Sequence, residues 1–266
     1  MEESRIGSLL MDVATILNEA LKDEGLYVNY AKIYYAVMKL LKEVSEQNEY
    51  QFPIEIKNIY KKLNIEVLKT NLNEFMGDGD PQKVNRIIGK ISIRPDYTSG
   101  KSKTSIYVEE NMSPAVTNYA LAHELCHYIL NSERTRYTDD YCIMPMLPKL
   151  AGELLADAFA IFLLIPFDKF LETFKKYIDD AKIKGSIPIN TEEWLNYLGS
   201  VAAVPYYYVA CAYQQIRHVA YLMYDIHIAD ENRRANYCGL YGKEVMGLYE
   251  MVKDKLDEET INLLYQ

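Results

Sequence analysis

The ten residues LAHELCHYIL, 121–130, place two of the chain's four histidines four positions apart, with a glutamate directly after the first. On an α-helix, residues four apart lie on one face, so His123 and His127 can reach a single metal ion. Neutral imidazole is a good zinc ligand. The stretch therefore predicts a helix that carries part of a zinc site, with Glu124 as a possible general base. One alternative stays open, because Glu124 and Cys126 flank the histidine pair at similar angles and either could approach the ion.

A second predicted helix, KLAGELLADAFAIFLLIP (149–166), offers the missing ligand. Its only acids are Glu153 and Asp157, again four apart, among residues that are otherwise almost all apolar. We expect this helix to be buried all round, and buried carboxylates need positive partners. A zinc ion on the two histidines would meet that need. Glu153 would be the third ligand, and Asp157 would accept a hydrogen bond that fixes one histidine's tautomer. The alternative is that both acids pair with surface lysines.

Two histidines and one glutamate leave one tetrahedral position for water, which is typical of catalytic zinc. Zinc in such a site polarises a carbonyl and lowers the pKa of water. Glu124 would take the water's proton and pass it to the leaving amine, so the residues favour hydrolysis of a peptide bond. An oxyanion stabiliser is expected nearby. The sequence leaves four candidates open, namely Tyr128, Tyr137, Tyr141 and His218.

The segment before the first histidine has the pattern of a small sheet. A short helix is expected over 54–63 and a strand over 65–68, and alternating residues predict a β-hairpin around the loop DYTSGKSKT, 96–104. Ser113-Pro114 then has the signature of a helix start. Helical periodicity occupies most of the remaining chain, and residues 244–266 are expected to form one charged C-terminal helix.

Composition limits the classes of function. The net charge of −9 argues against a nucleic-acid or anionic-membrane partner and suits a basic protein partner better. The acidic start lacks the features of a signal peptide, and the longest apolar run is too short to cross a bilayer. Four widely spaced cysteines indicate reduced thiols. We expect a cytoplasmic protein that binds neither nucleic acid nor membrane.

The two helical motifs, NYALAHELCHYIL (118–130) and ELLADAFAIFLLIP (153–166), follow a hairpin at 87–113, and in this order they resemble the ImmA/IrrE family of cytosolic metallopeptidases. The resemblance covers about 53–228. It implies zinc ligation by His123, His127 and Glu153, with Glu124 as the catalytic base. It also implies that the substrates are helix-turn-helix repressors, whose cleavage switches on a mobile element or a stress response.

Some features depart from that family's pattern. Cys126 stands where a glycine is usual, Leu155 replaces a common second acid, and the first fifty residues have no counterpart in the family core. In zincin-like folds the substrate strand commonly adds to a sheet edge beside the active-site helix, and the run 87–94 is the candidate edge.

The expected fold is therefore α+β, a zincin-like metallopeptidase core with a small antiparallel sheet and an active-site helix, predominantly helical overall. Along the chain we expect an N-terminal helical extension (1–50), the metallopeptidase core (51–185) and a C-terminal helical region (186–266). The expected function is a zinc-dependent endopeptidase acting on a specific intracellular protein.

Two other functions remain as alternatives. One is a DNA-binding regulator, because residues 192–218 have the sequence pattern of a helix-turn-helix motif. That would-be recognition helix carries no Lys or Arg before Arg217, although phosphate contacts need cations. The other is a non-catalytic, zinc-containing binding protein, an antirepressor or toxin-like partner.

Overall fold

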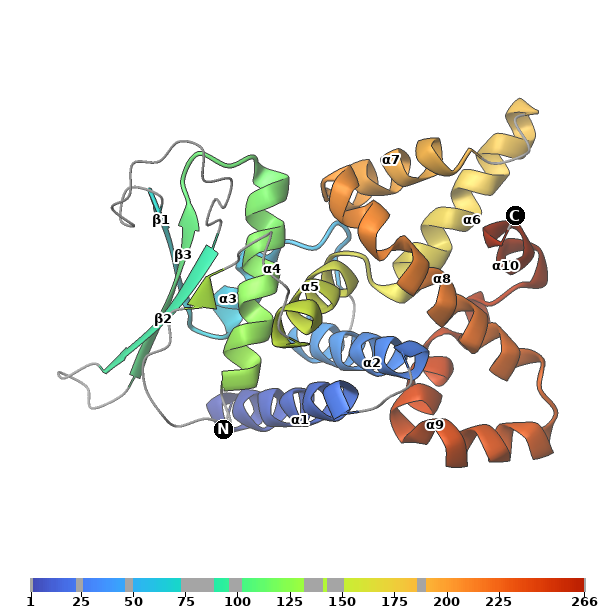
Figure 1. Ribbon diagram of the computed structural model, residues 1–266, viewed down its shortest axis with the longest axis horizontal. Helices are drawn as coiled ribbons and strands as arrows, with labels where there is room; N and C mark the ends of the chain where they lie inside the picture. Colours follow the sequence, from blue (N-terminus) through green and yellow to red (C-terminus); the bar gives the residue numbers. More distant parts are fainter. Residues whose placement is uncertain are drawn as a thin grey trace. The chain divides into compact units, whose positions relative to one another are not determined.

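The computed structural model shows an α+β protein that is predominantly helical, as expected (Figure 1). A small sheet lies beside one central helix, and further helices precede and follow this core along the chain. The structure describes residues 2–22, 26–45, 50–72, 89–95, 102–131, 141–142, 151–185 and 190–265.

The chain forms two compact units that do not follow sequence order. Unit 1 comprises Met1–Ala14 and Glu55–Ala160, and unit 2 comprises Thr15–Ile54 and Ile161–Gln266. Two of the three boundaries fall inside helices, α1 (Glu2–Lys22) and α5 (Ala151–Leu164), and the third lies between Ile54 and Glu55. The division into segments 1–50, 51–185 and 186–266 stays a prediction about sequence organisation.

The sheet of unit 1 is mixed, whereas the sequence led us to expect an antiparallel one. Its strands stand in the order β1-β3-β2-β4. The predicted hairpin is present, because β2 pairs antiparallel with β3 and Ile91 lies opposite Ile106. On the other side of β3, however, β1 runs parallel. The bounds are β1 Glu66–Thr70, β2 Gly89–Pro95, β3 Ser102–Glu109 and β4 Tyr141–Cys142.

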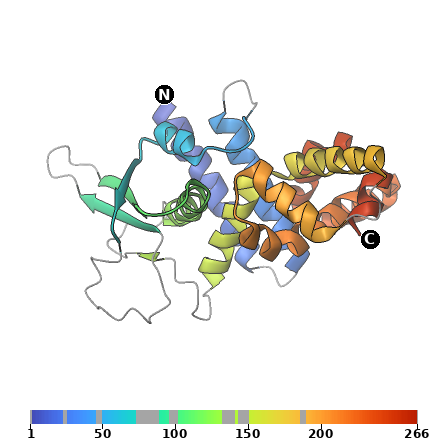
Figure 2. The ribbon, with the colours of Figure 1, turned by 90° about the horizontal axis from the view of Figure 1, so that it is seen from above.

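The central helix of unit 1 is α4 (Pro114–Asn131), which contains the stretch LAHELCHYIL. It begins as predicted, because the Ser113 carbonyl accepts from the Thr117 N–H at 2.9 Å and the Ser113 hydroxyl accepts from the Val116 N–H at 3.4 Å. The helix packs against β2 and β3, and Figure 2 shows it nearly end-on beside the strands.

A short helix, α3 (Ile56–Lys62), also packs on α4. Its fully buried Tyr60 donates a hydrogen bond from its hydroxyl to the Leu121 carbonyl at 2.6 Å. A buried hydroxyl without a partner would cost about 1–3 kcal/mol, so this bond helps to fix α3 on the helix that carries the histidines.

Unit 2 is helical and is built around aromatic side chains. Trp194, the chain's single tryptophan, is fully buried. Phe170 and Phe174 meet its ring edge-on, with ring centroids 5.9 and 4.9 Å away. The helices that begin in this unit are α2 (Leu26–Val44), α6 (Phe167–Lys184), α7 (Thr191–Ala202), α8 (Tyr206–Ile228), α9 (Glu231–Val252), the 3₁₀ helix η2 (Lys253–Lys255) and α10 (Glu258–Leu264).

The expected single C-terminal helix over 244–266 is wrong. The chain leaves α9 at Val252, passes through η2 and restarts as α10. The restart has a local cause, because the Asp257 side chain accepts a hydrogen bond from the Thr260 N–H at 2.8 Å. An aspartate in that position caps the free N–H groups of a new helix, and helical periodicity alone does not reveal the break.

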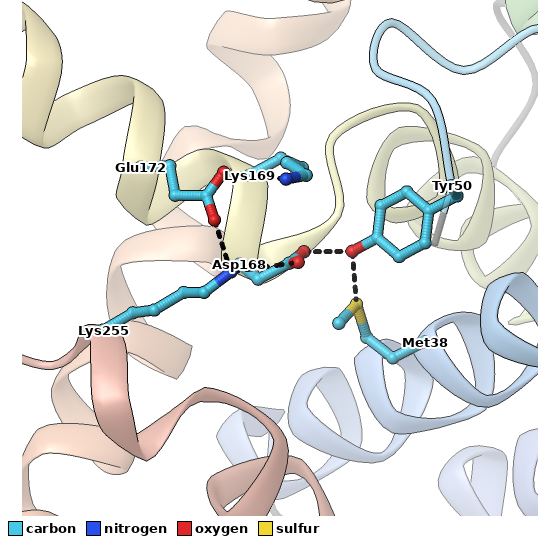
Figure 3. Close-up of polar contacts among 6 residues, drawn as sticks. All are labelled: Met38, Tyr50, Asp168, Lys169, Glu172 and Lys255. Carbon is cyan, nitrogen blue, oxygen red and sulfur yellow. Dashed lines mark hydrogen bonds and ion pairs between the residues drawn. The ribbon is translucent and has the colours of Figure 1, made fainter. Parts of the chain in front are cut away.

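A polar cluster joins four parts of unit 2, namely the segment at Tyr50, α2, α6 and η2 (Figure 3). The Tyr50 hydroxyl donates to the carboxylate of the buried Asp168 on α6 and lies 3.6 Å from the sulfur of Met38 on α2. The Lys255 ammonium lies 3.3 Å from the other Asp168 carboxylate oxygen and also pairs with Glu172. Asp168 is therefore a buried carboxylate that has both a hydrogen bond and an ion pair.

Candidate metal centre

The two histidines of α4 lie one helical turn apart and point to the same place. His123 is 1% exposed and His127 is 6% exposed, and their Nε2 atoms are 3.0 Å apart. Two ring nitrogens that face each other this closely are either joined through a shared proton or directed at a common ligand. The helix therefore forms the pair that the i, i+4 spacing predicts.

Glu153, on the first turn of α5, joins both histidines. One carboxylate oxygen lies 3.3 Å from His123 Nε2, and the other lies 3.4 Å from His127 Nε2. Ligand atoms placed tetrahedrally at about 2.0–2.1 Å from zinc stand about 3.3–3.4 Å from one another. Two nitrogens and a carboxylate at these separations fit one tetrahedral metal ion, and these three residues lie close enough to bind a metal.

The electrostatics of Glu153 are consistent with such a site. Partial burial works to raise the pKa of its carboxyl, but the hydrogen bonds and charges of His123 and His127 outweigh burial and hold this pKa well below its usual range. Glu153 is therefore ionised at neutral pH. An ionised carboxylate is the form that binds a metal.

Asp157 lies one turn further along α5. Its Oδ1 is 3.0 Å from His123 Nδ1, the ring nitrogen that faces away from the three-residue cluster. The same oxygen accepts a hydrogen bond from the Tyr119 hydroxyl at 2.7 Å. The contact between Asp157 and His123 is the one expected from the sequence, and its effect on a bound metal stays a prediction. Sequence reasoning missed Tyr119, although it stands four positions before His123 on the same helix face.

The helix that carries these acids, α5, is more exposed to solvent than expected. Leu154 is 57% exposed, and the side chains of Glu153 and Asp157 are 23% and 21% exposed. The expectation of burial all round is wrong for the first turns of α5, where the helix has an exposed side, and holds for most positions from Leu155 onward.

Glu124 is completely buried, next to the first histidine on α4. The backbone of Gly89, the first residue of β2, approaches it so closely that a Cβ at that position would lie 3.0 Å from Glu124 Oε1 and 3.1 Å from its Cγ. Such distances are shorter than ordinary van der Waals contact. A glycine is therefore required here if the glutamate side chain is to stay where it is. Sequence reasoning also missed Gly89, because no pattern in the sequence marks a glycine whose backbone closely approaches a side chain 35 positions away.

Cys126, the alternative to Glu124 beside the histidines, is fully buried. Burial, aided by the charge of Glu153, raises the pKa of its thiol well above the usual value. Since a thiolate rather than a thiol binds metal, Cys126 has the character of a small apolar residue.

The four candidates for an oxyanion stabiliser lie in different parts of the chain. Tyr128 is half-buried on α4, and burial raises the pKa of its hydroxyl. His218 belongs to α8 of unit 2, where burial, followed by the charge of Arg217, lowers the pKa of its ring. Tyr137 lies outside the described residues, and of Tyr141 the structure describes only the backbone, in β4.

The candidate edge for a substrate strand, 87–94, is only partly free. Residues 87 and 88 lie outside the described residues, and the rest belongs to β2. Within β2, Lys90 and Ile91 already pair with β4 from the same chain. A substrate strand would therefore have to add beyond β4 or take its place.

The comparisons with known proteins agree with this centre. The family described as IrrE N-terminal-like domain, Peptidase_M78, matches residues 60–192, which is half of the chain. This range contains β2, the H-E-x-x-H helix and both acids of α5. The chain belongs to this family, which is one of metallopeptidases. The searches of curated proteins and of solved structures found no match to the chain.

Among the described residues, no helix is both long enough and apolar enough to cross a membrane.

Proposed function

We propose that the protein is a zinc-dependent endopeptidase that cleaves one specific protein, a helix-turn-helix transcriptional repressor, in the cytoplasm. The observation that carries this proposal is the convergence of His123 Nε2, His127 Nε2 and the Glu153 carboxylate within 3.4 Å, with the buried Glu124 next along the helix. Two imidazoles and one carboxylate with a remaining open position are the ligand set of catalytic zinc.

Each residue has a distinct task in this proposal. His123, His127 and Glu153 hold the metal, and Asp157 keeps the Nδ1 proton of His123 on the outer side of the ring. Zinc bound there would act as a Lewis acid toward the scissile carbonyl and would acidify water. Glu124 accepts a proton from the attacking water and delivers it to the leaving amine nitrogen. Its burial shields the carboxylate from bulk water, which strengthens its interaction with the reacting groups.

The substrate class is supported by charge and by the family resemblance. A repressor's DNA-binding surface is basic, because it must contact phosphates. A chain with a net charge of −9 attracts such a surface over a distance of about one Debye length. The cytoplasmic location is supported by the three cysteines with described side chains, Cys126, Cys211 and Cys238, which are free thiols.

The direct test is a cleavage assay on helix-turn-helix repressors encoded near the chain's own gene. The zinc-loaded wild type should cut one of them at a defined bond, and 1,10-phenanthroline should abolish the cut. Glu124→Gln should keep its zinc but lose at least about 10²-fold in rate, because it cannot accept the proton. A Glu124→Gln protein that cleaves at the wild-type rate would remove Glu124 from this role.

A second candidate function is a non-catalytic zinc-containing binding protein. The observation that favours it is the pairing of β4 with Lys90 and Ile91, on the edge where a substrate strand would add. This candidate predicts tight, zinc-dependent binding of a repressor without any new peptide termini. Mass spectrometry of the repressor after prolonged incubation with the protein distinguishes the two candidate functions, since only a peptidase produces fragments.

A further inference from the structure

Tyr119 connects the outer side of the metal centre to the helix that carries the histidines. It stands on α4 one turn before His123 and is 3% exposed. Its hydroxyl donates to Asp157 Oδ1 at 2.7 Å, which is the usual length of an O–H···O hydrogen bond. The same oxygen lies 3.0 Å from His123 Nδ1. A single carboxylate oxygen thus contacts two residues of α4 that are four positions apart.

This arrangement fixes the direction of the Asp157 carboxylate. The Asp157 side chain is 21% exposed, so water can compete with His123 for its oxygens. The Tyr119 hydroxyl holds Oδ1 against α4, where Oδ1 accepts a hydrogen bond from His123 Nδ1–H. With the proton on Nδ1, a metal can replace any proton on His123 Nε2, and the Nε2 lone pair then faces the place between His127 and Glu153.

We propose that Tyr119 is a positioning residue for the metal centre: it holds Asp157, and through Asp157 it holds the tautomer and orientation of His123. This inference rests on the proposed function only in assuming that His123 Nε2 binds the metal. Tyr119 contacts neither the metal ligands' binding atoms nor a substrate, so its effect is on metal affinity rather than on a chemical step.

Two effects of the Tyr119 hydroxyl oppose each other, and the first should dominate. The hydroxyl orients Asp157, which favours metal binding. It also draws negative charge from Oδ1, which weakens the hydrogen bond that Asp157 accepts from His123 Nδ1–H. When the hydroxyl is removed, water can reach the part-exposed carboxylate and replace the lost hydrogen bond. Asp157 then remains almost as strong a hydrogen-bond acceptor, but its carboxylate is less firmly held in one orientation.

The test is a double-mutant cycle on zinc affinity, measured on the full chain by competition with a chromophoric chelator. Asp157→Asn should weaken zinc binding about 10–100-fold, as outer-shell partners of metal-binding histidines do. Tyr119→Phe should weaken it about three- to tenfold. Tyr119→Phe keeps the ring that lies 6.4 Å, centroid to centroid, from the His123 ring, so it removes only the hydroxyl bonded to Asp157. In the double variant, the loss should therefore equal that of Asp157→Asn alone. An affinity of Tyr119→Phe within twofold of wild type, or an equal added loss in both backgrounds, would overturn the inference.

A matched control separates positioning from general loosening of α4. Tyr60→Phe also removes a buried hydroxyl that bonds to α4, at the Leu121 carbonyl, but it does not touch Asp157. This variant should unfold at a lower temperature and keep wild-type zinc affinity. Equal losses of zinc affinity in Tyr60→Phe and Tyr119→Phe would show a mere packing effect and would contradict the proposal.

A second measurement needs no metal. Long-range ¹H–¹⁵N spectra of the zinc-free chain report which ring nitrogen of His123 carries the proton. Wild type should show the Nδ1–H tautomer, and Tyr119→Phe should show a mixture of tautomers. An unchanged tautomer would count against the inference. A wild type that binds no zinc overturns both this inference and the proposed function, whereas a chain that binds zinc but cuts nothing overturns only the peptidase proposal.

Discussion

Glu124 occupies its position because residue 89 is a glycine, which has no Cβ. Glu124 is wholly buried on α4, and the backbone of β2 reaches it only because residue 89 has no Cβ. The sequence predicted the grouping of His123, His127 and Glu153, because each i, i+4 pair shares one helix face and the acids of an apolar helix need a positive partner. It did not predict Gly89 or the Tyr119 hydroxyl bond, because neither a close backbone approach nor a neutral hydroxyl has a charge or spacing pattern that marks its partner.

Gly89→Ala should lower kcat about tenfold and leave zinc content unchanged. The new Cβ would stand 3.0 Å from Glu124 Oε1, so the carboxylate must move by several tenths of an ångström. Small displacements of a catalytic group are costly, and 1 Å can reduce the rate about 10²-fold. Steady-state kinetics on the cleaved repressor would measure kcat and KM separately. Gly239→Ala is the control, because its Cβ would enter open space, and kcat values that match for both variants would refute the contact's importance.

At the scale of helices and strands, periodicity predicted which segments are regular but not how they meet. The alternating residues of the hairpin gave the pairing of β2 with β3, since a short connection forces antiparallel strands. The direction of β1 was not predictable, because a strand on the far side of β3 can run either way. The break between α9 and α10 depends on one capping side chain, Asp257, within an otherwise helical pattern. Apolar content likewise overstated the burial of the first turn of α5.

Tyr50→Phe should destabilise unit 2 by about 1.5–3 kcal/mol, the usual range for a hydrogen bond to a charged group. Burial, reinforced by the charge of Asp168, raises the pKa of Tyr50 well above its usual value, so the hydroxyl keeps the proton that it donates. Without it, the buried Asp168 keeps its ion pair with Lys255 but loses the hydrogen bond from Tyr50 (Figure 3). Urea unfolding followed by Trp194 fluorescence reports on this unit, because Trp194 is fully buried within it.

The matched control is Tyr221→Phe, which removes the hydroxyl of a tyrosine that is 57% exposed on α8. Surface substitutions of this kind usually change stability by less than about 0.5 kcal/mol. If the urea midpoint of Tyr50→Phe equalled that of the control, the hydrogen bond from Tyr50 would contribute no stability.

For the whole molecule, grouping by contacts cuts across sequence order. Residues 15–54 and 161–266, the latter including the end of the family-matched segment, come together in unit 2, and two of the three unit boundaries fall inside α1 and α5. Local pattern could not predict this, because it depends on contacts between segments more than a hundred residues apart, such as the stacking of Tyr34 on Phe162. Overall charge was readable from the sequence without any fold, and it bears on partners rather than on architecture.

The net charge of −9 predicts that the protein does not bind DNA. Affinity for duplex DNA comes largely from cations placed on phosphates, and it is strongest at low salt. In a gel mobility assay at 50 mM salt, micromolar protein should leave random duplex DNA and operator DNA unshifted. The cognate repressor serves as the positive control on operator DNA. A shift by the chain alone that disappears at 200 mM salt would support the regulator alternative instead.

Metal content measures the central claim most directly. Wild type, Glu153→Ala and the control Glu192→Ala, which alters an exposed glutamate on α7, would be purified identically and analysed by inductively coupled plasma mass spectrometry. The account predicts about one zinc per chain in wild type and in the control, and a large loss in Glu153→Ala because one of three ligands is gone. Equal zinc in all three proteins, or none in wild type, would contradict it.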